Sequence, residues 1–456
     1  MLERAAYSTL MDWKQNNRNK ALLIDGARQI GKTYLIEHFA QNEYRNWIKV
    51  DFLTDSSAAR TLAAAQSTQQ VIEALSLITG KRISSGTLVF FDEVQEAQNI
   101  VTLSKYLVQD GRFDVILSGS MLGVELKHVK SFPVGYLCIE TMYPLSFEEF
   151  CRALNVPDSV LAMVDECYTK KTPLESAVHD RLIRLFRLYL VVGGMPEAVQ
   201  TYISSSNDLG AVREKQQELL RLYREDIAKY APERALQIKA IFDAIPSQLD
   251  KESKRFQIKS IDGTPRYERY ANDFAWLVGA KAALKTTNIT DPRPMLERSE
   301  EKGRFKLYQS DVGMLMARYR SNVALAALAG EKRVNFGAVY ENAVAQELTA
   351  ANVPLHYFYS SRVGEVDFIA ETDAGDVVPV EVKSGKDYKR HVALNNLMKN
   401  REYAIEYAYV LSEGNVSAEE REGGTVHYLP LYMLPAIVRD FHGSNLKGEV
   451  FAPPTW

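Results

Sequence analysis

A short glycine-containing segment near the N-terminus has the residue types of a phosphate-binding loop. Residues 26–33 read Gly-Ala-Arg-Gln-Ile-Gly-Lys-Thr, which matches the pattern GxxxxGK[ST]. Glycines let the backbone fold around phosphates, and the amide N–H groups at a helix start point at the anion. We expect Lys32 to reach the β and γ phosphates of ATP and Thr33 to hold Mg²⁺. The other residues expected to bind the nucleotide are Gly26, Ala27, Arg28, Gln29, Ile30 and Gly31.

An acidic pair after an apolar run supplies the second half of this site. Residues 88–93 read Leu-Val-Phe-Phe-Asp-Glu. A buried parallel strand that ends in Asp presents its carboxylate at the carboxyl edge of the sheet, beside the loop after the first strand. We expect Asp92 to bind Mg²⁺ through water and Glu93 to act as the general base on the attacking water. Ser118, at the end of another apolar run, is either a γ-phosphate sensor or part of a Ser-Gly turn.

Four charged residues near the C-terminus form another candidate site. Asp367 and Glu381 flank the turn signal Asp-Ala-Gly-Asp (373–376), so their segments read as a β-hairpin that brings them together. Glu381 and Lys383 share one face of a strand. This arrangement suits Mg²⁺-dependent phosphodiester cleavage, in which Asp367 and Glu381 ligate the metal and Lys383 activates the water. The alternative is a set of ordinary salt bridges with Lys383.

A third acidic residue of this candidate site, Glu341, lies in the predicted helix 336–353. Val344, Ala345 and Leu348 follow it at helical spacing, so Glu341 shares a face with apolar residues. A carboxylate on a buried face needs a partner or a metal. We therefore expect Glu341 to add a ligand to the same Mg²⁺, directly or through water.

The elements that position the phosphate loop alternate between strands and helices. Buried strands are predicted at 21–25, 46–52, 87–93 and 114–120, and helices between them include 32–40 and 98–110. This order predicts a parallel sheet with helices on both faces. The strand before the loop and the helix after it also argue against a chance match to the phosphate-loop pattern.

The predicted secondary structure changes twice in the rest of the chain. Long amphipathic patterns at 180–194 and 209–230 predict a helical region. A mixed stretch at about 233–330 follows, with a strand at 305–311. The last block, about 331–440, begins with a helix and continues with strands at 357–361, 364–372, 376–385, 408–413 and 426–430, which predicts a second α/β unit.

These segments together resemble AAA-type ATPases of prokaryotes. The resemblance rests on the segments GARQIGKT, LVFFDEVQ and LSGS. Two further segments, MYPLSFEEF (142–150) and YLVVGGMPEAV (189–199), restrict it to one group of these ATPases. It is strongest to a two-domain group with an N-terminal AAA ATPase and a C-terminal domain of unknown function. Many relatives have Gly-Arg before the PLSFEEF segment, whereas this chain has Phe-Pro-Val-Gly-Tyr at 132–136. We therefore assign no arginine finger.

The resemblance also implies a winged-helix module after the helical region. Lys281 and Lys285 would then lie near a DNA-contacting helix, with an ordinary solvated face as the alternative. The acidic residues of the last block resemble the PD-(D/E)XK nuclease clan, although Gly364-Glu365-Val366-Asp367 lacks the proline. Five basic residues flank that site and either bind phosphate or are simply solvated: Arg362, Lys386, Lys389, Arg390 and His391.

The expected fold class is α/β, with four regions. These are a P-loop AAA-type ATPase core at 1–155, a helical subdomain at 156–232, a winged-helix-like region at 233–330 and a restriction-endonuclease-like α/β domain of the PD-(D/E)XK type at 331–456. The expected cofactors are ATP and Mg²⁺, and the expected partner is nucleic acid, namely DNA. A homo-oligomer or a protein partner is also compatible with the sequence.

Composition excludes several classes. Lys and Arg number 55 against 58 Asp and Glu, a formal charge of −3, so any nucleic-acid site must be a local patch. Three cysteines (Cys138, Cys151 and Cys167) form no disulfide framework, which fits a cytoplasmic location. The N-terminal segment carries Glu3 and Asp12 and is no signal peptide, and no run of about 18 apolar residues predicts a membrane span.

Three functions remain open at this point. The first is an ATPase that drives or gates a nucleic-acid-processing C-terminal domain. The second is a nucleotide-dependent switch that controls partner binding through a catalytically degenerate nuclease-like domain. The third is a metabolic kinase that uses the same loop, although no motif here suggests a pocket for a small-molecule acceptor.

Overall fold

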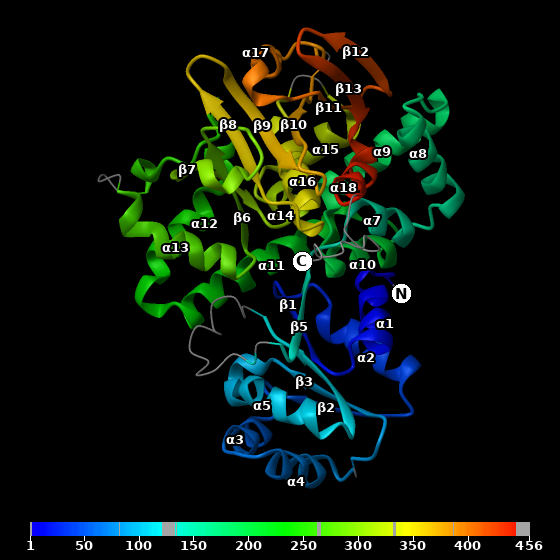
Figure 1. Ribbon diagram of the computed structural model, residues 1–456, viewed down its shortest axis with the longest axis vertical. Helices are drawn as coiled ribbons and strands as arrows, with labels where there is room; N and C mark the ends of the chain where they lie inside the picture. The colour runs from blue at the N-terminus through cyan, green and yellow to red at the C-terminus, as the bar shows by residue number, and fades with distance from the viewer. Residues whose placement is uncertain are drawn as a thin grey trace, which may run out of the picture. The chain divides into compact units, whose positions relative to one another are not determined.

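The computed structural model describes residues 2–81, 83–120, 133, 135–261, 266–331, 334–385 and 387–443 (Figure 1). These residues form two compact units, each built from segments that are separated in the sequence. The first unit contains Met1–Leu145, Met195–Phe242 and Glu268–Ala283, and the second contains Ser146–Gly194, Asp243–Tyr267 and Leu284–Trp456. The division into four regions at residues 155, 232 and 330 stays a prediction.

A five-stranded parallel sheet organises the first unit, in the order β2-β3-β4-β1-β5. Its strands are β1 (Ala21–Gly26), β2 (Asn46–Asp51), β3 (Thr87–Asp92), β4 (Phe113–Ser118) and β5 (Leu137–Met142). The four predicted strands are confirmed. The edge strand β5 escaped prediction because its residues are mostly half-exposed, so it has no continuous apolar run.

Helices cover both faces of this sheet, as the strand pattern predicts. The helices of the first unit are α1 (Ala6–Asn16), α2 (Lys32–Glu43), α3 (Ser56–Ala63), α4 (Thr68–Thr79), α5 (Gln98–Asp110), α10 (Pro196–Ser204), α11 (Leu209–Tyr230) and most of α13 (Tyr267–Gly279). Figure 1 shows α3, α4 and α5 gathered on one side of the sheet and α1 and α2 on the other. The face beneath α3 to α5 forms an apolar core that includes the stacked rings of Phe52 and Phe91. Burial on both faces is what a parallel sheet requires.

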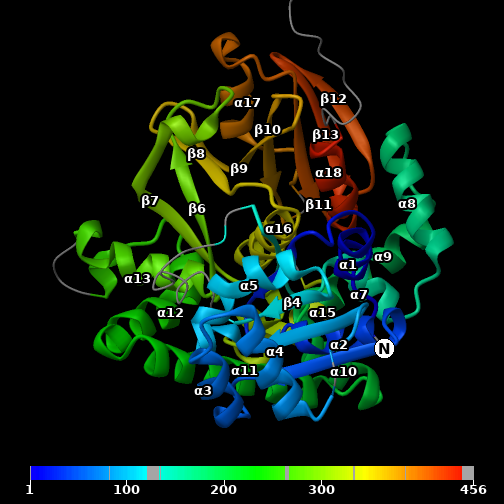
Figure 2. The same ribbon diagram turned by 60° about the horizontal axis from the view of Figure 1, so that its bottom comes forward.

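An eight-stranded mixed sheet organises the second unit, in the order β12-β13-β11-β10-β9-β8-β6-β7. Its strands are β6 (Ala283–Ile289), β7 (Glu300–Gln309), β8 (His356–Ser360), β9 (Gly364–Glu371), β10 (Val377–Val382), β11 (Tyr407–Ser412), β12 (Ser417–Arg421) and β13 (Gly424–Pro430). Figure 2 shows this sheet from β7 at one edge to β12 at the other. Strands β9 and β10 form the predicted antiparallel hairpin. Because β6 pairs with β8, strands from both sides of residue 330 share one sheet.

Helices from the middle and the end of the chain pack within the second unit. They are α7 (Phe147–Ala153), α8 (Asp158–Lys170), α9 (Ser176–Val192), α14 (Val312–Met316), α15 (Ser321–Ala329), α16 (Gly337–Ala350), α17 (Val392–Met398) and α18 (Leu434–Phe441), and α12 (Ala235–Leu249) contributes to both units. Helix α7 begins with a capping box between Ser146 and Glu149. In the described ranges, no helix combines the length and the apolar composition needed to cross a membrane.

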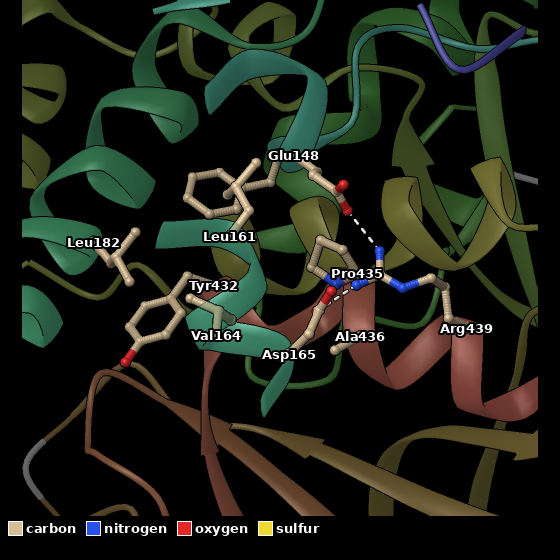
Figure 3. A pocket seen from close by; sticks show the side chains of 10 residues that line it. Glu148, Leu161, Val164, Asp165, Leu182, Tyr432, Pro435, Ala436 and Arg439 are labelled. Carbon is tan, nitrogen blue, oxygen red and sulfur yellow. Dashed lines mark hydrogen bonds and ion pairs between the residues drawn. The ribbon is translucent and has the colours of Figure 1, made fainter. Parts of the chain in front are cut away.

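Arg439 of α18 joins two of these helices. Its guanidinium lies 2.6 Å from Glu148 of α7 and 2.5 Å from Asp165 of α8 (Figure 3). Beside these ion pairs is a cavity of about 20 Å³, lined mainly by apolar side chains such as Leu161, Val164 and Leu182. A space this small holds roughly one water molecule, so this seam is packing and not a ligand site.

Candidate functional site

The phosphate loop connects the end of β1 to the start of α2. Gly26 has φ +151°, and a Cβ there would lie 2.4 Å from the carbonyl oxygen of Met142, so the close approach of β5 requires glycine. Gln29 and Gly31 have φ values of +64° and +86°. The chain thus reverses over a few residues and delivers the backbone N–H groups of a helix start to one point.

Lys32 lies inside this loop and is buried. Its ammonium group donates hydrogen bonds to the carbonyl oxygens of Gly26 (3.0 Å) and Ala27 (2.8 Å). Burial lowers the pKa of Lys32, while Glu93 and Asp92 oppose that shift. The loop therefore encloses a cation, which is the counter-charge that a polyphosphate needs.

Oxygen-bearing side chains from α2, β3 and β4 meet beside Lys32. The Thr33 hydroxyl donates to Asp92 Oδ2 at 2.9 Å, and Ser118 donates to the other carboxylate oxygen of Asp92. Lys49 of β2 lies 3.3 Å from Asp92 Oδ2. Carboxylate and hydroxyl oxygens are the donors that Mg²⁺ prefers, and it usually takes one or two from protein and the rest from phosphates and water. Thr33 and Asp92 therefore fit a nucleotide-bound Mg²⁺.

Glu93 follows Asp92 directly and has an unusual backbone conformation. Its φ is +56°, in the left-handed region that a glutamate rarely adopts, which is a strain found mainly at functional sites. Ser120 donates to Glu93 Oε2 from its hydroxyl (3.0 Å) and its backbone N–H (3.3 Å), and Gln95 also donates to this oxygen. The carboxylate is thus held next to the proposed metal ligand.

The sequence left several contributors to this site without a role. Ser120 was one of two hydroxyls at a predicted strand end, of which only Ser118 was named as a site residue, and Lys49 was not singled out. Lys49 also pairs with Glu37 at 2.8 Å, and it is a charged residue within an otherwise strand-like run, which is a weak signal. Asp226 of α11 forms an ion pair with Arg28 of the loop, and nothing local in the sequence links those two residues.

The acidic residues of the C-terminal site come together in the second unit as predicted. Val380 pairs with Phe368 in the β9–β10 hairpin, which places Asp367 opposite Glu381. The backbone N–H of Val382 donates to Asp367 Oδ2 at 3.0 Å. Glu341 of α16 is 1% exposed, in agreement with its predicted buried face.

Lysines occupy the space between these carboxylates. Lys306 of β7 has no exposed surface, and its Nζ lies 2.7 Å from Glu365 and 3.5 Å from both Glu341 and Asp367. Lys254 also pairs with Glu341, and Tyr308 donates to Glu341 Oε2 at 3.0 Å. Lys383 pairs with Glu381 at 2.6 Å.

This alternation of charges does not fit a bound divalent cation. A metal ligated by Glu341, Asp367 and Glu381 would lie among three ammonium groups that already neutralise them. Among the residues that the structure describes, no group of three or more His, Cys, Asp or Glu side chains is arranged to hold a metal ion. The sequence missed Lys254 and Lys306 as partners because both lie outside the quoted motifs. Glu365 stands inside the quoted segment Gly364–Asp367, but it was given no role.

The electrostatics of the cluster follow from burial and from these pairs. Burial, reinforced by Asp367, raises the pKa of Glu381 to about 8. Burial acts in the same direction on Asp367, but Lys306 and Lys254 outweigh it and lower the pKa of that carboxyl. Glu381 therefore holds a proton more tightly than an ordinary glutamate, whereas Asp367 holds one less tightly than an ordinary aspartate.

Four of the basic residues expected at a nucleic-acid surface have partners within the chain. Lys389 pairs with Glu419 at 2.7 Å, and His391 is buried and hydrogen-bonded to Tyr428. Lys281 lies 3.8 Å from Asp25, and Lys285 lies over the Phe305 ring. Lys386, and residues 132 and 134 of the segment where relatives have Gly-Arg, lie outside the described residues.

Three segments of the chain each match the model of a known protein family. Residues 18–151 match the family model of an AAA domain, residues 183–323 match a domain of unknown function (DUF8612), and residues 336–434 match another domain of unknown function (DUF4143). No curated protein matches the chain. The first match agrees with the parallel sheet and phosphate loop of the first unit, which has the fold of an AAA-type P-loop domain.

Among solved structures, the chain is similar to PCH-2 of C. elegans. The two share 16% sequence identity with a TM-score of 0.26, over 46% of this chain. The chain spans 66% of the length of that protein, a little less than two thirds.

Proposed function

We propose that the first unit binds ATP and hydrolyses it with Mg²⁺. The observation that carries this proposal is the 2.9 Å hydrogen bond from Thr33 to Asp92, because it joins the phosphate loop to the acidic strand end. A phosphate loop, two adjacent oxygen donors and a separately held glutamate are the parts that phosphoryl transfer to water needs. The match of residues 18–151 to an AAA domain supports the same conclusion.

Each side chain then has a distinct task. The loop N–H groups and Lys32 bind the phosphates, and Thr33 and Asp92 hold Mg²⁺, which supplies charge neutralisation. Glu93 accepts a proton from the attacking water, and Ser120 keeps its carboxylate oriented toward that position. Ser118 fixes Asp92 through its hydrogen bond, so in this proposal its role as γ-phosphate sensor becomes indirect.

Calorimetry with ATP tests this proposal. Lys32→Ala is expected to abolish ATP binding, because the only side-chain cation enclosed by the loop carbonyls is removed. Lys20→Ala is the matched control, since Lys20 directly precedes β1, at the end of that strand opposite to the phosphate loop. Equal ATP binding by wild type and Lys32→Ala would overturn the proposal.

We further propose that nucleotide turnover controls the second unit, and the lysine-filled cluster favours the switch over the nuclease. The three buried carboxylates already have ammonium partners, which suits a degenerate site that binds a protein partner. The competing function is cleavage of DNA, with the winged-helix-like region as the DNA-contacting part. Incubation of the full chain with DNA and RNA under Mg²⁺ or Mn²⁺ decides between them. Cleavage that is lost in Lys383→Ala, while ATP turnover persists, would establish the nuclease.

We also propose a cytoplasmic location. The three cysteines are free thiols in the structure, which fits a reducing compartment in which ATP is abundant. Fractionation of cells that express the tagged full chain tests this, and recovery with a membrane or secreted fraction would contradict it.

A further inference from the structure

Helix α11 contacts the phosphate loop through one face near its C-terminal end. Asp226 forms an ion pair with Arg28 of the loop, and the Tyr223 hydroxyl donates to the Arg28 carbonyl oxygen at 3.1 Å. Tyr223 and Asp226 are three residues apart, so they lie on the same side of the helix. Both are at least nine-tenths buried, whereas the Arg28 side chain is 31% exposed. The helix therefore holds a loop residue by its side chain and by its backbone.

The same end of α11 also contacts the segment after the acidic strand. Lys229 lies 3.5 Å from Glu96, and the Tyr230 hydroxyl donates to Glu96 at 3.4 Å. Glu96 belongs to the short helical turn that begins directly after Glu93. One end of one helix thus contacts both halves of the nucleotide site.

Electrostatics place Asp226 in competition with a phosphate for Arg28. Burial raises the pKa of Asp226 and Glu93 adds to that shift, whereas Arg28 and, to a smaller extent, Lys229 oppose it, so Arg28 is the main counter-ion of this carboxylate. A triphosphate in the loop brings several negative charges to the guanidinium and to the neighbouring carboxylates. A guanidinium drawn toward phosphate leaves a buried carboxylate without its counter-ion, which is costly.

We propose that Asp226 is a positioning residue that makes α11 a latch on the phosphate loop, released when the phosphates of ATP take over Arg28. This inference rests on the proposed ATP binding. It identifies α11 as the element whose contacts change when nucleotide binds. Tyr223 and the Lys229–Glu96 pair keep the helix close, so what is released is the side-chain contact between Asp226 and Arg28 and not the whole helix.

Titration of the full chain with Mg²⁺ and adenylyl imidodiphosphate, a non-hydrolysable ATP analogue, tests the latch. Asp226→Asn removes the competing anion, so it is expected to lower the Kd roughly threefold to tenfold. Glu225→Gln, an exposed carboxylate one residue earlier on the helix, is the matched control and leaves the Kd unchanged. Adding Arg28→Ala to Asp226→Asn is expected to remove the gain.

Amide hydrogen exchange gives a second measurement. If Asp226 had only a structural role, nucleotide binding would not change the exchange rates in α11. Nucleotide is expected to raise exchange at residues 223–230 of wild type, because the Arg28 contact is given up. Unchanged or weaker nucleotide binding by Asp226→Asn, or a gain that persists without Arg28, overturns the latch while ATP binding stands. Absence of nucleotide binding by folded wild type would overturn the proposed function and the latch together.

Discussion

The ammonium group of Lys306 lies 2.7 Å from the Glu365 carboxylate in a position with no exposed surface. The same group is within 3.5 Å of Glu341 and Asp367, two of the residues whose types suggested a magnesium site. Replacement of one partner in a buried ion cluster leaves the other charges uncompensated, and that loss is large. Lys306 is therefore the natural place to test what the cluster does.

Lys306→Met is expected to destabilise the second unit by about 3–5 kcal/mol, because three carboxylates lose their shared counter-ion. Denaturant unfolding of the full chain measures this change. Lys302→Met, an exposed lysine on the same strand β7, serves as the control and is expected to change stability by less than about 0.5 kcal/mol. If both variants unfold at the same denaturant concentration, the cluster contributes nothing to stability.

Glu93→Gln is expected to bind ATP normally and to lose hydrolysis by roughly 10²- to 10⁴-fold, because the amide cannot accept the proton of the attacking water. Phosphate release under saturating ATP and Mg²⁺ measures turnover, and calorimetry measures binding. Glu73→Gln, which removes an exposed carboxylate from α4, should leave both quantities unchanged. Turnover by Glu93→Gln at the wild-type rate would show that another group is the base.

Ser118→Ala is expected to raise the Mg²⁺ concentration for half-maximal ATP turnover by about tenfold, because Asp92 loses the hydroxyl that orients it. The readout is a Mg²⁺ titration at fixed ATP. Ser104→Ala provides a comparison, since that buried hydroxyl donates to a helix carbonyl away from the metal ligands. A shift of similar size in both variants would indicate a general loss of packing.

Glu347 of α16 provides a pH-dependent contribution to the stability of the second unit. Burial raises the pKa of Glu347 to about 7, and Glu149 and Glu148 add to this effect, while the Phe147 N–H and the Tyr189 hydroxyl oppose it by donating to the carboxylate. Because the folded pKa lies above the ordinary value of 4.5, unfolding releases a proton between these pH values. The contribution is therefore complete below pH 4.5 and is lost as pH rises to 7.

Glu347→Gln is expected to remove this loss, which is of the order of 2 kcal/mol between pH 4.5 and 7. Unfolding free energies of wild type and variant, measured at several values across that range, give the difference. Glu402→Gln, at an exposed position, should follow the wild-type curve. Parallel curves for wild type and Glu347→Gln would rule out this carboxyl as the source.

The residues of the phosphate loop and of the acidic strand end could be identified from the sequence alone. Residues 26–33 and the run ending in Asp92 and Glu93 are contiguous, and their chemistry depends on a strand that ends where a helix or a turn begins. Apolar runs of that kind predict parallel strands directly, and parallel strands bring their carboxyl ends to one edge. The hairpin that joins Asp367 to Glu381 was equally predictable, since a four-residue turn signal separates its strands.

Tertiary structure alone decided which charges face one another. Lys254 and Glu341 are 87 residues apart, Arg28 and Asp226 are 198 apart, and no periodicity relates either pair. A lysine between two apolar residues of a strand, as Lys306 is, reads as an outward-facing residue until another layer covers that face. Local pattern shows which side of an element a residue occupies, whereas its partner is set by the packing of distant elements. The sequence therefore predicted the acidic residues of the C-terminal site and Lys383, but not Lys254 and Lys306, which pair with those acidic residues.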